Sequence, residues 1–201
     1  MKAIVIGATG TIGSAVVRRL ETSGYEVIKA SRHSEESVDI QYEDSIKKLL
    51  ERTGKVDVVI SAAGRAAFGE MNKLSDDDFA LSIGNKLMGQ VKLLQNGLSW
   101  LNPGGTILLT GGIFAYKPVP GSAAIAMVNA ALEGFVRAAA LETGDNKKVI
   151  VIHPPLVAET AQMMGLDPTP YISAEEASEA YLDAINNGKS GVPFFAKNNA
   201  P

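Results

Sequence analysis

Short apolar runs rich in β-branched residues alternate with longer amphipathic segments along almost the whole chain. Such runs are typical of buried strands, whereas apolar positions at helical spacing indicate an amphipathic helix. The pattern predicts strands over residues 2–6, 25–30, 38–40, 56–64, 104–112, 148–156 and 191–195. It predicts helices over residues 14–24, 43–54, 74–101, 121–143 and 173–188, the third of them broken near Gly84 and Asn85.

This alternation predicts an α/β fold in which a parallel sheet is covered by helices on both faces. The chain has 201 residues, which is enough for one domain with a complete core. Ligands of such folds bind beyond the carboxyl ends of the strands. The candidate site segments are therefore the loops that follow the strands, at residues 7–13, 31–33, 61–69, 110–120 and 154–165.

The loop GATGTIG joins the first predicted strand to the first predicted helix. Its glycines permit a tight turn and a close approach of the backbone, and the helix that follows offers unpaired N–H groups to a phosphate. In this strand–turn–helix setting the motif indicates a dinucleotide site, although a tight turn without a ligand stays open. The residues expected to bind the cofactor here are Gly7, Thr9, Gly10, Thr11 and Ile12, with Gly13 completing the turn.

The second predicted strand ends in Ala30-Ser31-Arg32-His33, without an acidic residue to hold a free ribose 2′-hydroxyl. A hydroxyl and a guanidinium suit a 2′-phosphate, so Ser31 and Arg32 favour NADP over NAD. The alternative is that Arg32 is a solvated surface residue. Asp39, at the end of the short third predicted strand, is expected either to accept a hydrogen bond from the adenine amino group or to cap its loop.

Composition narrows the function classes. The net charge is −3 and the basic residues are scattered, so no surface for nucleic acid is indicated. The chain has no cysteine, which excludes disulfides and cysteine-based zinc sites, and His33 and His153 form no metal-ligand pattern. The first apolar run, AIVIGA, is too short to span a bilayer and lacks the layout of a signal peptide. We therefore expect a cytoplasmic protein without a membrane partner.

Several segments together resemble the short-chain dehydrogenase/reductase family. GATGTIG resembles the family's glycine-rich loop, and SAAG at 61–64 resembles its Asn-Ala-Gly turn after the fourth strand. HPPLVAET at 153–160 resembles its segment after the sixth strand, with Pro155 in place of a glycine. Asn85 falls where the family keeps an asparagine at a break in its fourth helix, and residues 126–142 have the texture of its active-site helix.

This resemblance covers nearly the whole chain, although the family's usual helix between the second and third strands is missing. It implies a single Rossmann-type domain over residues 1–201, a doubly wound parallel sheet with a short substrate-loop region at about 156–172. The further cofactor-binding residues that it implies are Ala62, Ala63, Gly64, Asn129 and Pro154.

The family's chemistry is hydride transfer between a nicotinamide and a carbonyl or alcohol. The resemblance implies a Tyr-x-x-x-Lys pair on the helix predicted at 121–143, and a serine thirteen residues before the tyrosine. An alignment anchored on residues 130–142 puts Ile125 at the tyrosine, Asn129 at the lysine and Gly112 at the serine. Isoleucine cannot transfer a proton, and asparagine can hydrogen-bond a ribose hydroxyl but brings no charge. Of the family's tetrad only Asn85 remains, as a catalytic or a structural residue.

Tyr116, beside Lys117 on the loop before that helix, is the candidate substitute proton donor; the alternative is an aromatic ring that covers the loop. Thr110 and Ser122 are candidates for orienting a substrate, and His153 is a further candidate acid.

Two functions stay open. One is an NADP(H)-binding reductase of a small carbonyl or alcohol with a non-standard acid/base; the other is a non-catalytic nucleotide-binding sensor or scaffold. An isomerase or nucleotide-sugar reaction has no specific support.

The helix predicted at 121–143 carries small residues on more than one face. A helix that is apolar all round must be buried all round. One face can cover the sheet, and the family resemblance implies that the other packs with the helix at 85–101 in a two-fold bundle. We therefore expect a homodimer or a homotetramer, with a small-molecule substrate as a further partner if the chain is an enzyme.

Overall fold

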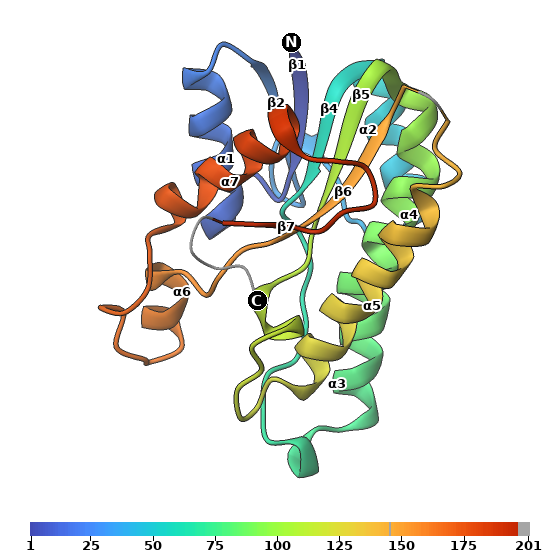
Figure 1. Ribbon diagram of the computed structural model, residues 1–201. Coiled ribbons are helices and arrows are strands. Elements are labelled where there is room, and N and C mark those ends of the chain that lie inside the picture. Colours follow the sequence, from blue (N-terminus) through green and yellow to red (C-terminus); the bar gives the residue numbers. More distant parts are fainter. Residues whose placement is uncertain (145, 197–201) are drawn as a thin grey trace.

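Figure 1 shows the computed structural model, which describes residues 1–144 and 146–196. A seven-stranded sheet has the order β3-β2-β1-β4-β5-β6-β7, and all six pairings are parallel. Its strands are β1 (Lys2–Ile6), β2 (Glu26–Ser31), β3 (Glu36–Ser37), β4 (Val56–Ser61), β5 (Leu101–Thr110), β6 (Lys148–His153) and β7 (Phe194–Phe195). The winding direction reverses between β1 and β4, which places the expected ligand crevice at their carboxyl ends.

Two helical layers cover the sheet. One layer contains α1 (Thr11–Thr22) and α7 (Ala174–Asn187); the other contains α2 (Glu43–Thr53), α4 (Met88–Gly97) and α5 (Ala123–Ala139). Shorter elements connect them: α3 (Asp76–Leu81), α6 (Ala158–Met163), the 3₁₀ turns η1 (Met71–Lys73), η3 (Leu98–Trp100) and η4 (Ile113–Ala115), and the π-helical segment η2 (Ser82–Leu87). The predicted single α/β Rossmann-type sheet is confirmed.

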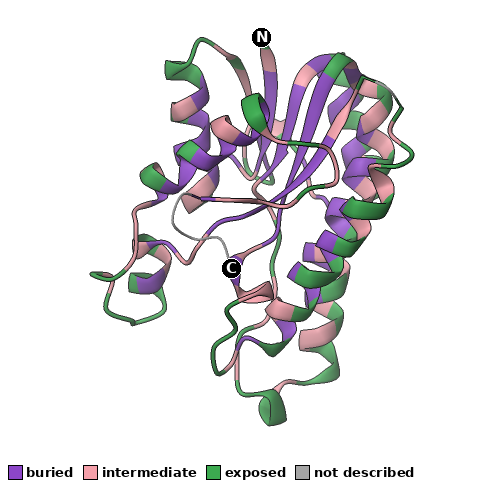
Figure 2. Ribbon diagram, viewed as in Figure 1, coloured by how far each residue is buried: buried purple, intermediate pink, exposed green. Residues whose placement is uncertain are grey.

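The core lies on both faces of the sheet. In β1, Ile4 and Ile6 pack into the cluster beneath α2, α4 and α5, whereas Ala3 and Val5 pack into the cluster beneath α1 and α7. All four side chains are buried. Burial on both faces explains why the strands read as continuous apolar runs rather than as alternating ones. Figure 2 shows the same pattern, with buried residues along the strands and on the inner faces of the helices.

The strand predicted over residues 38–40 is wrong, because β3 is confined to Glu36–Ser37. Val38 and Ile40 are buried, and the Val38 N–H still donates to the carbonyl oxygen of Ser31 at 3.0 Å, but the backbone then leaves the sheet: the N–H of Asp39 donates to Ser45 Oγ at 2.9 Å. Two buried apolar residues in a loop thus gave the same alternating sequence pattern as a strand. The helix α6 was also missed, in a segment that the prolines 154 and 155 marked as loop.

The interruption predicted near Gly84 and Asn85 is confirmed, and it takes the form of the π-helical segment η2. Helix α3 before it begins at Ser75 and α7 begins at Ser173, each with a capping box. The predicted strands 56–64, 148–156 and 191–195 are shorter at one end than expected, so SAAG and the two prolines lie mostly in loops. None of the helices described is long and apolar enough to cross a membrane.

Candidate functional site

Two pockets lie beyond the carboxyl ends of the strands and share Ala62, Ala63 and Gly64 from the loop after β4. The β2-side pocket is lined by the loops after β1, β2 and β4, together with Asn85. The α5-side pocket is lined by Ile12, by the segments after β4, β5 and β6, and by residues of η2 and α5. The sheet edge thus offers one continuous site with two chemically different halves.

The glycine loop forms one wall of the β2-side pocket. Gly7 has φ of +88°, and a Cβ there would lie 2.7 Å from the carbonyl oxygen of Ala62. A Cβ on Gly13 would lie 2.0 Å from the carbonyl oxygen of Gly7. Gly10 is the N-cap of helix α1 and provides no side-chain cap, and the first turn of α1 has no acidic residue. Its first N–H groups are therefore available to an anion, as a pyrophosphate requires.

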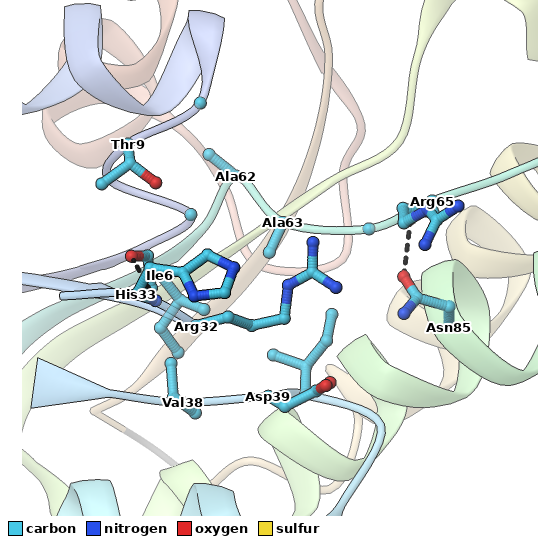
Figure 3. A pocket seen from close by; sticks show the side chains of 15 residues that line it. Ile6, Thr9, Arg32, His33, Val38, Asp39, Ala62, Ala63, Arg65 and Asn85 are labelled. Carbon is cyan, nitrogen blue, oxygen red and sulfur yellow. Dashed lines mark hydrogen bonds between the residues drawn. The ribbon is translucent and has the colours of Figure 1, made fainter.

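The end of β2 supplies the opposite wall. The Arg32 side chain extends into the pocket, and no carboxylate of the described residues pairs with it (Figure 3). Ser31 is buried, and its Oγ accepts a hydrogen bond from the N–H of His33 at 3.3 Å. Asp39 Oδ1 accepts from the N–H of Gln41 at 3.0 Å, so Asp39 caps its loop, in agreement with one of its two interpretations. Its contact with an adenine stays a prediction.

Arg65 is a second cation at this pocket, and sequence reasoning missed it. Its backbone N–H donates to Asn85 Oδ1 at 2.6 Å, and Figure 3 shows both side chains on the same side of the pocket. The available signal was its position directly after SAAG, within a loop that was already a candidate segment. Asn85 thus lines the β2-side pocket and ties the β4 loop to η2; its catalytic role stays a prediction.

Gly112, Ile125 and Asn129 come together in the α5-side pocket. Asn129 is fully buried; its Nδ2 donates to the carbonyl oxygen of Gly112 at 3.3 Å, and its Oδ1 has no hydrogen-bond partner in the described structure. A Cβ on Gly112 would lie 2.8 Å from Asn129 Nδ2, so glycine permits this close approach. An unpaired buried acceptor is costly, and a hydroxyl group of a bound molecule would satisfy it.

Lys86 also lines the α5-side pocket, and sequence reasoning missed it as well. Its side chain is buried, and Nζ donates to the carbonyl oxygens of Thr110 and Gly111 at 3.3 and 3.1 Å. Burial lowers the pKa of Lys86 to about 8. The signal was its place beside Asn85 at the helix break, because a π-helical turn shifts which neighbouring residue faces inward.

Known proteins share this fold. A profile of the family described as enoyl-(acyl carrier protein) reductase matches residues 7–187. The crystal structure of the protein lin1944 from Listeria innocua superposes with a TM-score of 0.89 at 35% identity, covering 97% of this chain and 98% of that one. The chain belongs to the short-chain dehydrogenase/reductase family.

Further similar proteins include a dehydrogenase, a reductase and a nucleotide-binding protein. A small-chain dehydrogenase crystallised in complex with NADPH has a TM-score of 0.84 at 27% identity, covering 97% of this chain and 95% of that one. Versicolorin reductase stcU of Emericella nidulans is 29% identical over 72% of this chain. The cyclic-di-GMP-binding biofilm dispersal mediator protein of Escherichia coli is 28% identical over 70%. The matched segments span 64% and 66% of these last two proteins.

In this short-chain dehydrogenase/reductase, Tyr116 lies outside the residues that line the two pockets. Its hydroxyl donates to Glu133 Oε2, and its ring packs edge-on against His153 and Phe195. Burial, and after it the hydrogen bond to Glu133, raises the pKa of Tyr116 to about 12. The geometry therefore favours the alternative, an aromatic ring that covers the loop, over a proton donor.

The other candidates are engaged elsewhere. His153 is fully buried behind Gly112: its Nδ1 lies 3.1 Å from the Gly112 nitrogen, and its Nε2 lies 3.3 Å from Glu133 Oε2. Burial lowers the pKa of His153, so the imidazole is neutral at pH 7. Ser122 Oγ is bonded to the backbone of Val119, and Thr110 Oγ1 lies 3.0 Å from the Tyr181 hydroxyl. None of these hydroxyls is free to orient a substrate in this arrangement.

Proposed function

We propose that this chain is an NADP(H)-dependent reductase that acts on a small carbonyl compound. The observation that carries the cofactor assignment is the β2-side pocket, whose lining combines the glycine loop before the uncapped helix α1 with Arg32 and Arg65, and in which Asp39 is the only acidic residue among those lining it. The arginines suit a 2′-phosphate, and the helix end suits a pyrophosphate. The relative crystallised with NADPH supports this assignment.

The residues proposed to hold the dinucleotide follow the site from one end to the other. Arg32 and Ser31 hold the 2′-phosphate end, with Asp39 beside the adenine. Gly7, Thr9, Gly10, Thr11 and Ile12 hold the pyrophosphate; Ala62, Ala63 and Gly64 lie along the chain of the cofactor. Asn129 Oδ1 accepts from a hydroxyl of the nicotinamide ribose, and Pro154 lines the ring's side of the pocket. The cofactor supplies the hydride; the protein positions it beside the α5-side pocket.

The α5-side pocket sets the substrate class. Its lining is mostly apolar and includes Ile113, Phe114 and Ile125, together with Leu156 and Val157. No acidic side chain of the described residues lines it. A small apolar aldehyde or ketone fits this environment better than a polyhydroxylated sugar, whose hydroxyls would lose hydrogen bonds. Residues 156–172, which include α6, are the proposed substrate-loop region.

A non-catalytic nucleotide-binding function is the second candidate. The replacements at Gly112, Ile125 and Asn129 favour it, because general acid catalysis contributes about 10²–10⁴-fold. A relative whose name states that it binds cyclic-di-GMP is consistent with a binding role on this fold. In either case we propose a homodimer or homotetramer through α4 and α5, where Met88 and Met127 are exposed apolar side chains, as is Ile83 of the adjoining η2.

The test is an equilibrium titration followed by a substrate screen. NADPH fluorescence is followed as the protein is added, with NADH as the comparison, and a panel of aldehydes and ketones is then screened for loss of NADPH absorbance. Binding with turnover supports the reductase, and binding without turnover across the panel supports the second candidate. Failure to bind either nucleotide contradicts both.

A further inference from the structure

A buried lysine lies in the same pocket where the family's tyrosine and lysine are replaced. We propose that Lys86 is the proton donor of the α5-side pocket, giving a proton from Nζ to the carbonyl oxygen of the substrate. This proposal rests on the reductase function and names the group that performs its missing step. It assigns a catalytic role to a residue at a helix break, on a different element of the pocket lining from Ile125.

The surroundings of Lys86 hold the ammonium group in place. Gly64 lies against its stem, since a Cβ on Gly64 would be 3.0 Å from Lys86 Cγ. Gln90 Nε2 donates to the Lys86 carbonyl oxygen at 3.1 Å and to that of Thr110 at 3.0 Å, while its Oε1 accepts from the Thr110 N–H at 2.8 Å. The side chain that positions Lys86 therefore also positions one of its two acceptors.

The hydrogen bonds of Lys86 leave one proton unassigned. An ammonium group has three donors, and two of them reach the carbonyl oxygens of Thr110 and Gly111. In the part of the chain that the structure describes, no third acceptor and no carboxylate partner is present. After proton transfer, the neutral amine still has two N–H groups for the same two carbonyl oxygens. The protein thus satisfies both protonation states, and only the third proton changes.

The charge environment suits a proton donor at neutral pH. Burial places the pKa of Lys86 at about 8, so the group is mostly protonated at pH 7 yet acidic enough to release its proton. The titratable groups around it are His153 from β6, neutral at pH 7, and Tyr181 from α7, which reaches Thr110 Oγ1. Glu133 of α5 is bonded to Tyr116 and Arg137, behind His153.

The proposed step balances as a carbonyl reduction. The carbonyl carbon receives a hydride from a reduced nicotinamide nucleotide, and the π electrons of the C=O bond move to its oxygen. That oxygen takes the proton from Lys86 Nζ, which gives the alcohol and a neutral amine. Solvent then returns a proton to the amine. Oxidation of an alcohol is the same sequence in reverse, with neutral Lys86 as the base.

The experiment compares three variants with the intact chain. Lys86→Met removes the charge, Lys86→Arg keeps a cation that cannot release a proton at ordinary pH, and Lys92→Met is the control, because Lys92 bonds the carbonyl oxygen of Gln41 outside both pockets. We expect both Lys86 variants to lose about 100-fold in turnover at pH 7, and Lys92→Met to lose less than about twofold. Reduction by the intact chain falls as pH rises through about 8.

A second readout does not depend on turnover. A cation beside the oxidised, positively charged nicotinamide disfavours NADP⁺ relative to NADPH, so the ratio of the two dissociation constants measures the charge at this place. We expect Lys86→Met to lower the ratio of the dissociation constant of NADP⁺ to that of NADPH about tenfold, and Lys86→Arg to preserve this ratio. A positional role alone would change binding of both nucleotides alike. The ratio of the two dissociation constants can be measured for every variant that binds both nucleotides, whether or not the variant has activity.

The outcomes separate this proposal from the function on which it rests. If the intact chain binds no NADPH, the proposed function fails. If it binds NADPH and reduces a carbonyl, but Lys86→Arg retains turnover, Lys86 is not the proton donor and the reductase function stands. Turnover that stays constant between pH 6 and 9.5 contradicts the proposal without any variant, so it stays testable if the variants do not fold. NADPH binding without turnover of any carbonyl also overturns it.

Discussion

The two pockets of this chain are built from different materials. The β2-side pocket is shaped by backbone: glycines that cannot carry a Cβ and a helix end without a cap. The α5-side pocket is shaped by side chains, and the sequence alignment predicts that Gly112, Ile125 and Asn129 stand there at the positions of the groups that the family resemblance implies. A glycine of the loop that forms the β2-side pocket leaves no room for a larger residue, so its substitution should disrupt nucleotide binding. A catalytic side chain, in contrast, can be supplied from another position in the sequence. Lys86, on η2 rather than α5, is our candidate for such a move.

Breaking the backbone cradle is expected to have the largest effect. In Gly13→Ala, the new Cβ would lie 2.0 Å from the Gly7 carbonyl oxygen, so the loop or α1 must shift. We expect a loss of about 3 kcal/mol in the free energy of unfolding and no measurable NADPH binding, as in other severe steric changes. The measurements are chemical denaturation and nucleotide titration.

The matched control is Gly134→Ala. Gly134 lies within α5 and is exposed, and a Cβ added there would meet no neighbouring group within 4 Å. Alanine is the better helix former, so this variant should gain up to about 1 kcal/mol and bind NADPH normally. If Gly13→Ala behaves like this control, the loop is not a tightly packed cradle.

Removing the charge of the α5-side pocket is expected to change the pH dependence of stability. The folded-state pKa of Lys86, about 8, lies below its ordinary value of 10.5, so the buried charge costs stability below pH 8 and this cost disappears between pH 8 and 10.5. The intact chain should therefore gain up to about 3 kcal/mol relative to Lys86→Met over that range. Denaturation of both proteins from pH 7 to 10.5 checks this, and a constant difference between them would contradict the buried ammonium.

Removing one cation of the β2-side pocket should be smaller and selective. Arg32→Ala should weaken NADPH binding about 10- to 100-fold and NADH binding less than about threefold, because only NADPH has the 2′-phosphate. Arg65→Ala tests whether the second arginine shares this role. Equal weakening of both nucleotides by Arg32→Ala would remove the basis for preferring NADP.

The smallest effect on turnover is expected outside both pockets. Tyr116→Phe removes the hydroxyl that bonds Glu133 but leaves the ring against His153. We expect turnover within about twofold of the intact chain and a loss of about 1 kcal/mol in the free energy of unfolding. Steady-state kinetics and thermal melting measure the two effects. A loss of turnover near 100-fold would restore Tyr116 as the proton donor.

The sequence predicts well those parts of the molecule that depend on short-range residue patterns. The strand–helix alternation predicted the parallel sheet, and GATGTIG predicted the turn before α1. Val38 and Ile40 led to the wrong prediction of a strand over residues 38–40, because a loop can also bury alternate apolar residues. Lys86 and Arg65 were missed although each lies beside a candidate position, because the π-helical turn and the loop path decide which neighbouring residue lines a pocket.

The most direct test of the account is an equilibrium titration of the intact chain with NADPH and NADH at pH 7, followed by nucleotide fluorescence. The two arginines and the uncapped α1 predict saturable binding of NADPH at least about tenfold tighter than that of NADH. Equal affinity for the two nucleotides would contradict the role of Arg32, and an unchanged fluorescence signal with both would contradict the assignment of the site itself.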